Sequence, residues 1–247
     1  MESVLDRVIK QNTENVNLLK TKDYNIFSVL QIQSKEVLIC RMIADLLNPR
    51  GQHGAGAEYL KIFLKDCLGM EKMDTKLADQ AIVTAEYAID DERRIDIVIE
   101  IGSHFLPIEV KIYAADQKSQ CFDYYQYAKR RDAQAKVYYL TLDGHRPGKD
   151  STSSGSQSVP EEDIVCLSFR EHILNWLKAC KNCENTGMIP ILEQFIRNIE
   201  QISGYTSERV RNMVIDELLK SGDSLRAGMQ IADSVNVAKA KRFCSKL

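Results

Sequence analysis

The chain has no large excess of charge of either sign. Its 247 residues carry 33 Lys and Arg against 35 Asp and Glu, which gives a formal net charge of -2. This balance excludes the generally basic surface of a histone-like protein. Because charges are screened over about 8–10 Å in physiological salt, binding of an anionic partner would need a local basic face.

Long apolar runs are also missing. No stretch approaches the roughly 20 apolar residues that a membrane-spanning helix needs. The first residues, Met1 to Lys20, contain no apolar run followed by a small-residue cleavage site. We therefore expect a cytoplasmic protein that has no membrane partner. The 7 cysteines, irregularly spaced and odd in number, fit a reducing compartment better than a disulfide framework.

Several compact catalytic and metal-binding motifs are absent. Cys180 and Cys183 form one C-x-x-C pair, but no second pair completes a tetrahedral zinc site. The stretch Gly144–Asp150 has too short a glycine spacing for a P-loop, and an aspartate where Ser or Thr is needed. No H-E-x-x-H or G-x-S-x-G motif occurs. His53 lies in a glycine-rich turn, where we expect a structural hydrogen bond; substrate contact is the alternative.

The periodicity of apolar residues predicts one α/β domain. Helical patterns cover residues 2–19, 34–47 (with Ser34 as N-cap), 57–67, 116–131, 170–180, 189–202 and 207–221, and strand patterns cover 81–89, 93–101, 105–113, 136–142 and 164–168. Residues 144–160 are rich in Ser, Gly and Pro and predict a loop. We expect a single domain over residues 1–247, with its core at about 34–169 and a helical C-terminal part at 170–247.

Two of the predicted strands carry charge in a pattern. In residues 94–100 the isoleucines occupy alternate positions, so Asp96 points to the opposite face. In residues 107–112 the apolar side chains again share one face, and Glu109 and Lys111 share the other. If the two strands pair, two carboxylates and an ammonium come within reach of each other. The alternative is a solvated sheet face with a surface ion pair that contributes under about 1 kcal/mol.

This set of side chains suits the hydrolysis of a phosphodiester. Two carboxylates can hold Mg²⁺ through hard oxygen ligands and leave positions open for water and phosphate. The ion polarises the phosphoryl oxygen and acidifies bound water. A lysine beside it supplies positive charge to the transition state and can orient or deprotonate the attacking water.

The same residues carry a family resemblance. The run Arg94–Ile99, followed by Ile108–Ile112, resembles the PD-(D/E)XK nuclease superfamily. It is similar to a bacterial group in which an IExK strand precedes a Dq..Q...Y helix, here Asp116–Tyr124. The segment upstream also fits that group, with Glu36, Arg41, Leu46–Pro49 and the turn Gly51–Gly56 in order. The chain departs from the superfamily in having Ile95 where proline often stands, and Ile39-Cys40 where the group often has His-Ser.

The resemblance implies a restriction-endonuclease-like core, with a central mixed sheet in αβββαβ order and helices on both sides. It also implies Mg²⁺-dependent cleavage of nucleic acid, with Mn²⁺ as a substitute, and we expect DNA as the substrate. Asp96, Glu109 and the carbonyl of Val110 would bind the metal, and Lys111 would assist the water. Glu36 would add a metal-facing carboxylate; an exposed helix charge is the alternative.

The predicted helix 116–131 offers a substrate-binding face. Gln117, Gln120 and Tyr124 are spaced to share one side, and their amide and phenol groups can contact phosphate or base. The stretch Lys129–Arg131 could contact a phosphate backbone or lie solvated at the helix end. A catalytically silent nucleic-acid-binding or protein-interaction module on the same fold is the alternative function, and a homodimer is left open.

Overall fold

The computed structural model describes residues 24–71, 74–183, 185–204, 215–216, 218–226 and 228–230. The chain divides into two compact units, one of them Asn25–Ser203 and the other Met1–Tyr24 with Gly204–Leu247. The predicted helix 2–19 and most of the predicted helix 207–221 lie outside the described residues. A single domain over the whole chain stays a prediction. Among the described residues, no helix has the length and apolar character needed to cross a membrane.

A five-stranded mixed sheet forms the centre of Asn25–Ser203. Its order is β1 (Ile82–Ala88), β2 (Arg94–Ile101), β3 (His104–Lys111), β4 (Val137–Thr141) and β7 (Ile164–Ser168). Pairing is antiparallel from β1 to β3 and parallel from β3 to β7. The short connections between the first three strands make them a meander, whereas α6 provides the crossover that a parallel neighbour requires. The predicted mixed sheet is confirmed.

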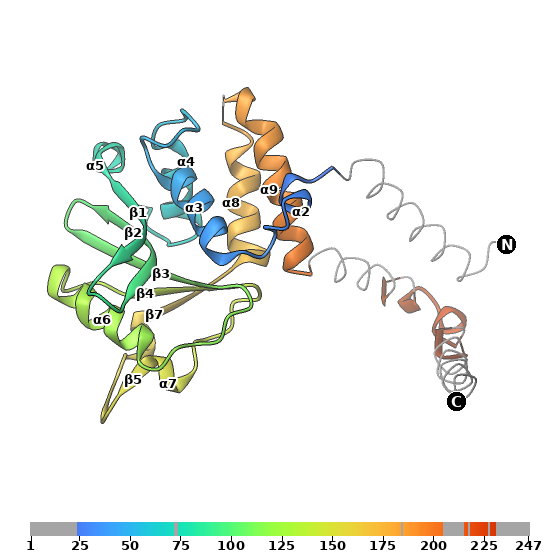
Figure 1. Ribbon diagram of the computed structural model, residues 1–247. Helices are drawn as coiled ribbons and strands as arrows, with labels where there is room; N and C mark the ends of the chain where they lie inside the picture. Colours follow the sequence, from blue (N-terminus) through green and yellow to red (C-terminus); the bar gives the residue numbers. More distant parts are fainter. Residues whose placement is uncertain are drawn as a thin grey trace. The chain divides into compact units, whose positions relative to one another are not determined.

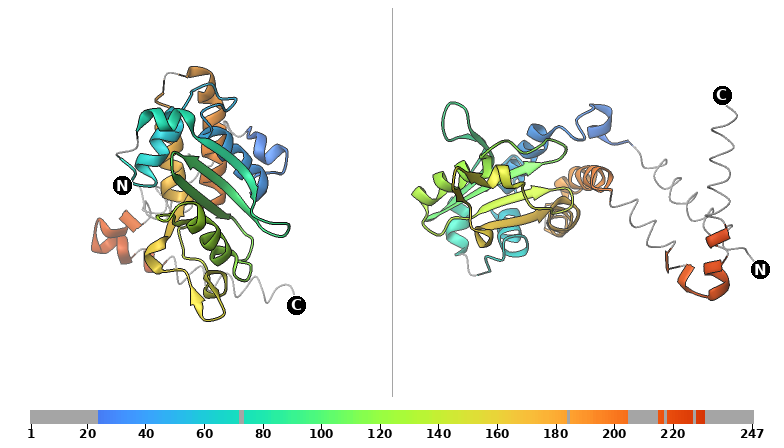
Figure 2. Two further views of the ribbon diagram at one scale, coloured as in Figure 1. Left: turned by 90° about the vertical axis from the view of Figure 1, so that its left-hand side faces the viewer. Right: turned by 90° about the horizontal axis from the view of Figure 1, so that it is seen from below.

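Helices cover both faces of this sheet. Figures 1 and 2 show α6 (Gln120–Arg131) against one face, with α3 (Glu36–Leu47), α4 (Glu58–Asp66), α8 (Leu174–Cys180) and α9 (Ile189–Ile202) on the other side. The order α3, β1, β2, β3, α6, β4 is the predicted αβββαβ order. As a result β3 is buried from Phe105 to Lys111, with apolar and charged side chains alike withdrawn from water.

Short elements were missed where the pattern was too brief to detect. These are α2 (Ile26–Val29), α5 (Thr75–Gln80), and, inside the predicted loop 144–160, α7 (Lys149–Thr152) with the small hairpin of β5 (Ser153–Ser154) and β6 (Gln157–Ser158). Single 3-10 turns lie at Glu161–Asp163 and Thr186–Met188. The predicted helix 170–180 begins with a π-helical turn, Phe169–Ile173.

Two helix starts were predicted too early. Lys35, and not Ser34, is the N-cap of α3. The helix predicted from residue 116 begins only at Gln120, because Ser119 has φ 58 and so interrupts the right-handed helix. Asp116 accepts hydrogen bonds from the Tyr139 hydroxyl at 2.6 Å and the Gly148 amide at 2.7 Å, which fixes the chain ahead of α6 outside the helix. Gln117 therefore precedes α6.

Candidate active site

The candidate site begins where β2 and β3 separate. Their ladder has its last pair at Ile97 and Ile108, one step short of Asp96. In place of a further ladder bond, Asp96 Oδ2 accepts a hydrogen bond of 2.7 Å from the main-chain amide of Val110. On the other side, Glu86 of β1 has φ 53 and makes no ladder pair with Asp96. Asp96 therefore forms no ladder pair with β1 or with β3.

Glu109 and Lys111 are buried side chains at the carboxyl end of β3. Glu109 is 1% exposed and Lys111 is 7% exposed, and Oε1 of Glu109 contacts Nζ of Lys111. The interpretation of this pair as a solvated surface ion pair is therefore wrong. Since the desolvation of both groups opposes their attraction, a buried pair of this kind is weak support for stability.

The second oxygen of Glu109 is the most unusual atom of the site. Glu109 Oε2 is buried and has no hydrogen-bond partner. Burial, and then the charge of Asp96, raise the pKa of Glu109 well above its ordinary value. Burial also raises the pKa of Asp96, although the Val110 amide and Lys111 partly oppose that shift. An acid whose charge is disfavoured by a neighbouring carboxylate, with one buried oxygen left without a partner, fits a hard divalent cation.

Glu36 reaches the same place from the first turn of α3. Its Oε2 accepts a hydrogen bond of 2.7 Å from the amide of Ile112, just past the end of β3. Burial acts to lower the pKa of Lys111, but the charges of Glu109, Asp96 and Glu36 outweigh it, so the pKa lies above its usual value. Lys111 is therefore an ammonium in the metal-free protein.

The metal-binding capacity of the site is limited to oxygen atoms. Among the described residues, no group of three or more His, Cys, Asp or Glu side chains forms a ready metal cluster. The oxygen atoms that could hold a cation are those of the Asp96 and Glu109 carboxylates and the main-chain carbonyl of Val110, with Glu36 alongside. Such a hard, incomplete set suits Mg²⁺, which keeps several water ligands.

Cys40 of α3 faces this acidic group. It is 1% exposed, and burial followed by the charges of Asp96, Glu36 and Glu109 raises the pKa of its thiol. The group remains a neutral thiol, which fills space between α3 and the sheet without adding charge.

Gln120 and Tyr124 are inside the protein rather than on an open helix face. Tyr124 is 1% exposed; its hydroxyl donates to the carbonyl of Arg94 and accepts a 3.0 Å hydrogen bond from the amide of Gln120. The amide of Gln117 lies 3.5 Å from Gln120 Oε1. These contacts fix the main chain of β2 two residues ahead of Asp96. Their predicted contact with substrate stays a prediction.

Arg93 is a residue of the site region that the sequence did not reveal. Its guanidinium donates to Asp123 of α6 at 3.0 Å, to Gln117 Oε1 at 2.9 Å and to the carbonyl of Lys118 at 2.6 Å. One side chain thus ties the start of β2 to the β3–α6 connector, residues 112–119. The only signal in the sequence was its place next to the strand that carries Asp96.

Two weaker predictions are resolved by the contacts. His53 is 4% exposed and uses both ring nitrogens, at 3.0 Å to the Asn48 carbonyl and 3.0 Å from the Ala55 amide, which confirms a structural role. At the C-terminal end of α6, Lys129 pairs with Asp163 at 3.2 Å and Arg131 with Glu100 at 2.6 Å, so much of that charge is neutralised.

Comparison with known proteins agrees with this geometry. The model of a family in the PD-(D/E)XK nuclease superfamily matches residues 24–197, which include every predicted site residue. No curated protein and no solved structure gives a match. The match extends over well over half of the sequence, over the whole mixed sheet and over its flanking helices as far as the middle of α9. The chain therefore belongs to the PD-(D/E)XK nuclease superfamily, and its α/β core is of the restriction-endonuclease type.

Proposed function

We propose that the protein is a metal-dependent nuclease that hydrolyses phosphodiester bonds of nucleic acid, with DNA as the substrate. The observation that carries the proposal is the buried, unpartnered Oε2 of Glu109 beside the Asp96 carboxyl. A purely structural sheet would gain nothing from this arrangement, because an unsatisfied buried acceptor costs about 1–3 kcal/mol.

Asp96, Glu109 and the carbonyl of Val110 would hold the cation, Mg²⁺ or Mn²⁺, and Glu36 would support it from α3. When bound, the cation polarises the phosphoryl oxygen and lowers the pKa of a coordinated water. Asp96 is held in place for this by the Val110 amide. Glu36 is held in the same way by the Ile112 amide. Both carboxylates are therefore oriented before substrate arrives.

Lys111 provides the positive charge of the reaction. Without metal its ammonium contacts Glu109 Oε1. In the reaction Lys111 would donate a hydrogen bond to a phosphoryl oxygen or to the attacking water. Stabilisation of this kind acts where negative charge accumulates, and it is strong in a site withdrawn from bulk water.

The remaining contacts maintain the geometry. The hydroxyl of Tyr124 fixes the carbonyl of Arg94, two residues before Asp96. Arg93 fixes the β3–α6 connector, which follows Lys111. Strand β2 and the end of β3 are thus held together from the side of α6, where small displacements would separate the carboxylates from the ammonium.

The test is a cleavage assay on the purified chain. Plasmid, single-stranded DNA and RNA are each incubated with Mg²⁺, Mn²⁺ or EDTA, using wild type, Glu109→Gln and Lys111→Gln. Glu100→Gln is the matched control, since Glu100 lies on β2 but pairs with Arg131 outside the site. We expect metal-dependent cleavage by wild type and the control, and a loss of at least about 100-fold in the two site variants. Equal cleavage by all four proteins would refute the assignment, and binding without cleavage would favour a silent module.

A further inference from the structure

Strand β4, the parallel neighbour of β3, ends beside the candidate site. Strands β3 and β4 run parallel, with Glu109 paired to Tyr139 and Lys111 paired to Thr141. Paired positions of neighbouring strands lie about 4.8 Å apart and project their side chains to the same face. Whatever follows Thr141 therefore lies at the carboxyl end of the sheet, next to Lys111. This edge is where open α/β sheets form their binding crevices.

The loop that follows, Asp143–Gly148, is fixed to the site strands at both ends. At its start, the amide of Gly144 donates to Thr141 Oγ1 at 2.9 Å. At its end, the amide of Gly148 donates to Asp116 Oδ2 at 2.7 Å, and Asp116 Oδ1 accepts from the Tyr139 hydroxyl at 2.6 Å. Both oxygens of Asp116 are thus bonded. The loop is held by the residues that flank Glu109 and Lys111.

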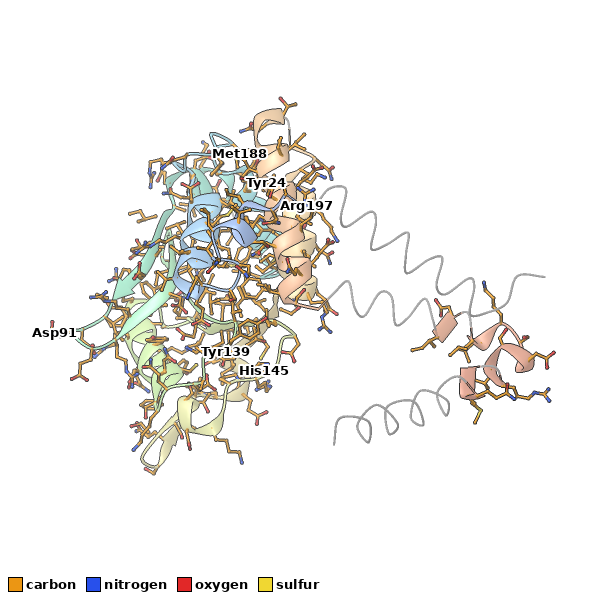
Figure 3. The ribbon with its side chains drawn as sticks, turned by 45° about the vertical axis from the view of Figure 1, so that its right-hand side comes forward. Tyr24, Asp91, Tyr139, His145, Met188 and Arg197 are labelled. Atoms are coloured by element: carbon orange, nitrogen blue, oxygen red, sulfur yellow. The ribbon has the colours of Figure 1, made fainter. Side chains whose placement is uncertain are left out.

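His145 is the residue that this loop presents. Its Nδ1 lies 2.5 Å from Asp143 Oδ1, and its ring meets the ring of Tyr139 edge-on, with centroids 6.2 Å apart. Figure 3 shows Tyr139 and His145 next to each other. The His145 side chain is 60% exposed. Because a carboxylate can only accept, Nδ1 carries a hydrogen, and Nε2 has no partner among the described residues.

We propose that His145, supported by Asp143, binds a phosphate of the nucleic acid strand next to the phosphate held at Glu109 and Lys111. This inference rests on the proposed function and assigns a further part of its substrate site. With Nδ1–H donated to Asp143, the exposed Nε2 edge of the ring is the side open to a phosphate oxygen, and it donates to that oxygen when it carries a hydrogen. Arg146, the next residue, is exposed and forms no ion pair in the described part of the chain, so it adds to the attraction.

The protein contains its own matched control. His104 pairs with Asp132 at 3.4 Å, and its side chain is 39% exposed. It is the first residue of β3, whereas Lys111 is the last. At about 3.3 Å per residue the two ends are roughly 23 Å apart. A partly exposed His–Asp pair is thus present at each end of the sheet, and only one of the two adjoins the site.

The experiment measures binding of labelled DNA in EDTA, where no cleavage interferes, over a series of salt concentrations. Wild type, His145→Gln, His145→Lys and His104→Gln are compared, and thermal unfolding checks that each is folded. We expect His145→Gln to weaken binding about tenfold and to lower the slope of log K against log salt by about 0.9 on duplex DNA. His145→Lys should restore both values, and His104→Gln should match wild type.

Wild-type affinity and slope in His145→Gln would overturn the inference, and so would an equal loss in His104→Gln. If wild type still cleaves DNA, either result leaves the proposed function intact. If wild type neither binds nor cleaves any nucleic acid, the proposed function fails, and the role of His145 fails with it.

Discussion

Replacing Glu109 by Gln should stabilise the metal-free protein. The substitution keeps an oxygen for Lys111 to bond and puts an amide NH₂, which can donate, in place of the orphaned Oε2 of a side chain that lies beside the Asp96 carboxyl. It also removes one of the three carboxylates that crowd around a single ammonium. A buried acceptor without a partner costs about 1–3 kcal/mol, so the gain in free energy of unfolding should be of that size.

The size of the effect can be measured by thermal unfolding in EDTA. For a chain of this length, about 1 kcal/mol moves Tm by roughly 2–4 °C, so a gain of about 1–3 kcal/mol should make the variant melt roughly 2–12 °C above wild type. Adding Mg²⁺ should raise the Tm of wild type by mass action and leave the variant nearly unchanged. The difference in Tm between the variant and wild type should therefore shrink or change sign as metal is added.

The control is Glu100→Gln, whose carboxylate pairs with Arg131 at the surface. It should change stability by no more than about 0.5 kcal/mol, with or without metal. A Glu109→Gln variant that melts below wild type in EDTA would refute the reasoning, as would equal stabilisation of both proteins by Mg²⁺. Either outcome would mean that Glu109 is satisfied in the metal-free fold and holds no cation.

Three further perturbations test the surroundings of the site. Tyr124→Phe leaves a main-chain carbonyl of β2 without its donor, and chemical denaturation should show a loss of about 1–3 kcal/mol. In Arg93→Lys the single ammonium group cannot bond Asp123, Gln117 and the connector carbonyl at once. Limited proteolysis should therefore cut the β3–α6 connector several-fold faster than in wild type, and equal rates would contradict this role of Arg93. Because the pKa values of both site carboxyls are raised on folding, the folded metal-free protein binds more protons than the unfolded chain. The site's contribution to stability is thus complete below about pH 4 and is lost as pH rises through the folded pKa values; calorimetry in EDTA should show this decline in wild type and much less of it in Glu109→Gln.

The sequence predicted the sheet well because the relevant signals are local. Alternation of apolar residues identifies a strand from the strand alone, and β7 at Ile164–Ser168 and α9 at Ile189–Ile202 were predicted to the residue. The sharp turns between β1, β2 and β3 then left antiparallel pairing as the expected arrangement. Local order also explains why Glu109 and Lys111 could be assigned to one face.

Burial could not be predicted in the same way. The alternation in β3 is compatible with one face exposed to water, and the packing of helices such as α6 and α3 against β3 makes Glu109 a buried carboxylate. The start of α6 depended on contacts with β4 and the loop before α7, far away in the sequence. No role was predicted for Arg93, Tyr139 or His145 for the same reason, since the contacts of each are with residues of another segment of the chain.

The main chain at the end of β3 has a consequence for which acids the site can tolerate. The amides of Val110 and Ile112, which a neighbouring strand would normally take, are given instead to Asp96 and Glu36. One carboxylate oxygen of each acid therefore replaces the carbonyl of a neighbouring strand as hydrogen-bond acceptor. That bond fixes how far the carboxylate lies from its own main chain. Asp96→Glu or Glu36→Asp would keep the charge but shift the carboxylate by one methylene relative to the amide that it now accepts from. The fold thus dictates the length of each acidic side chain, as well as its charge, before any ligand is present.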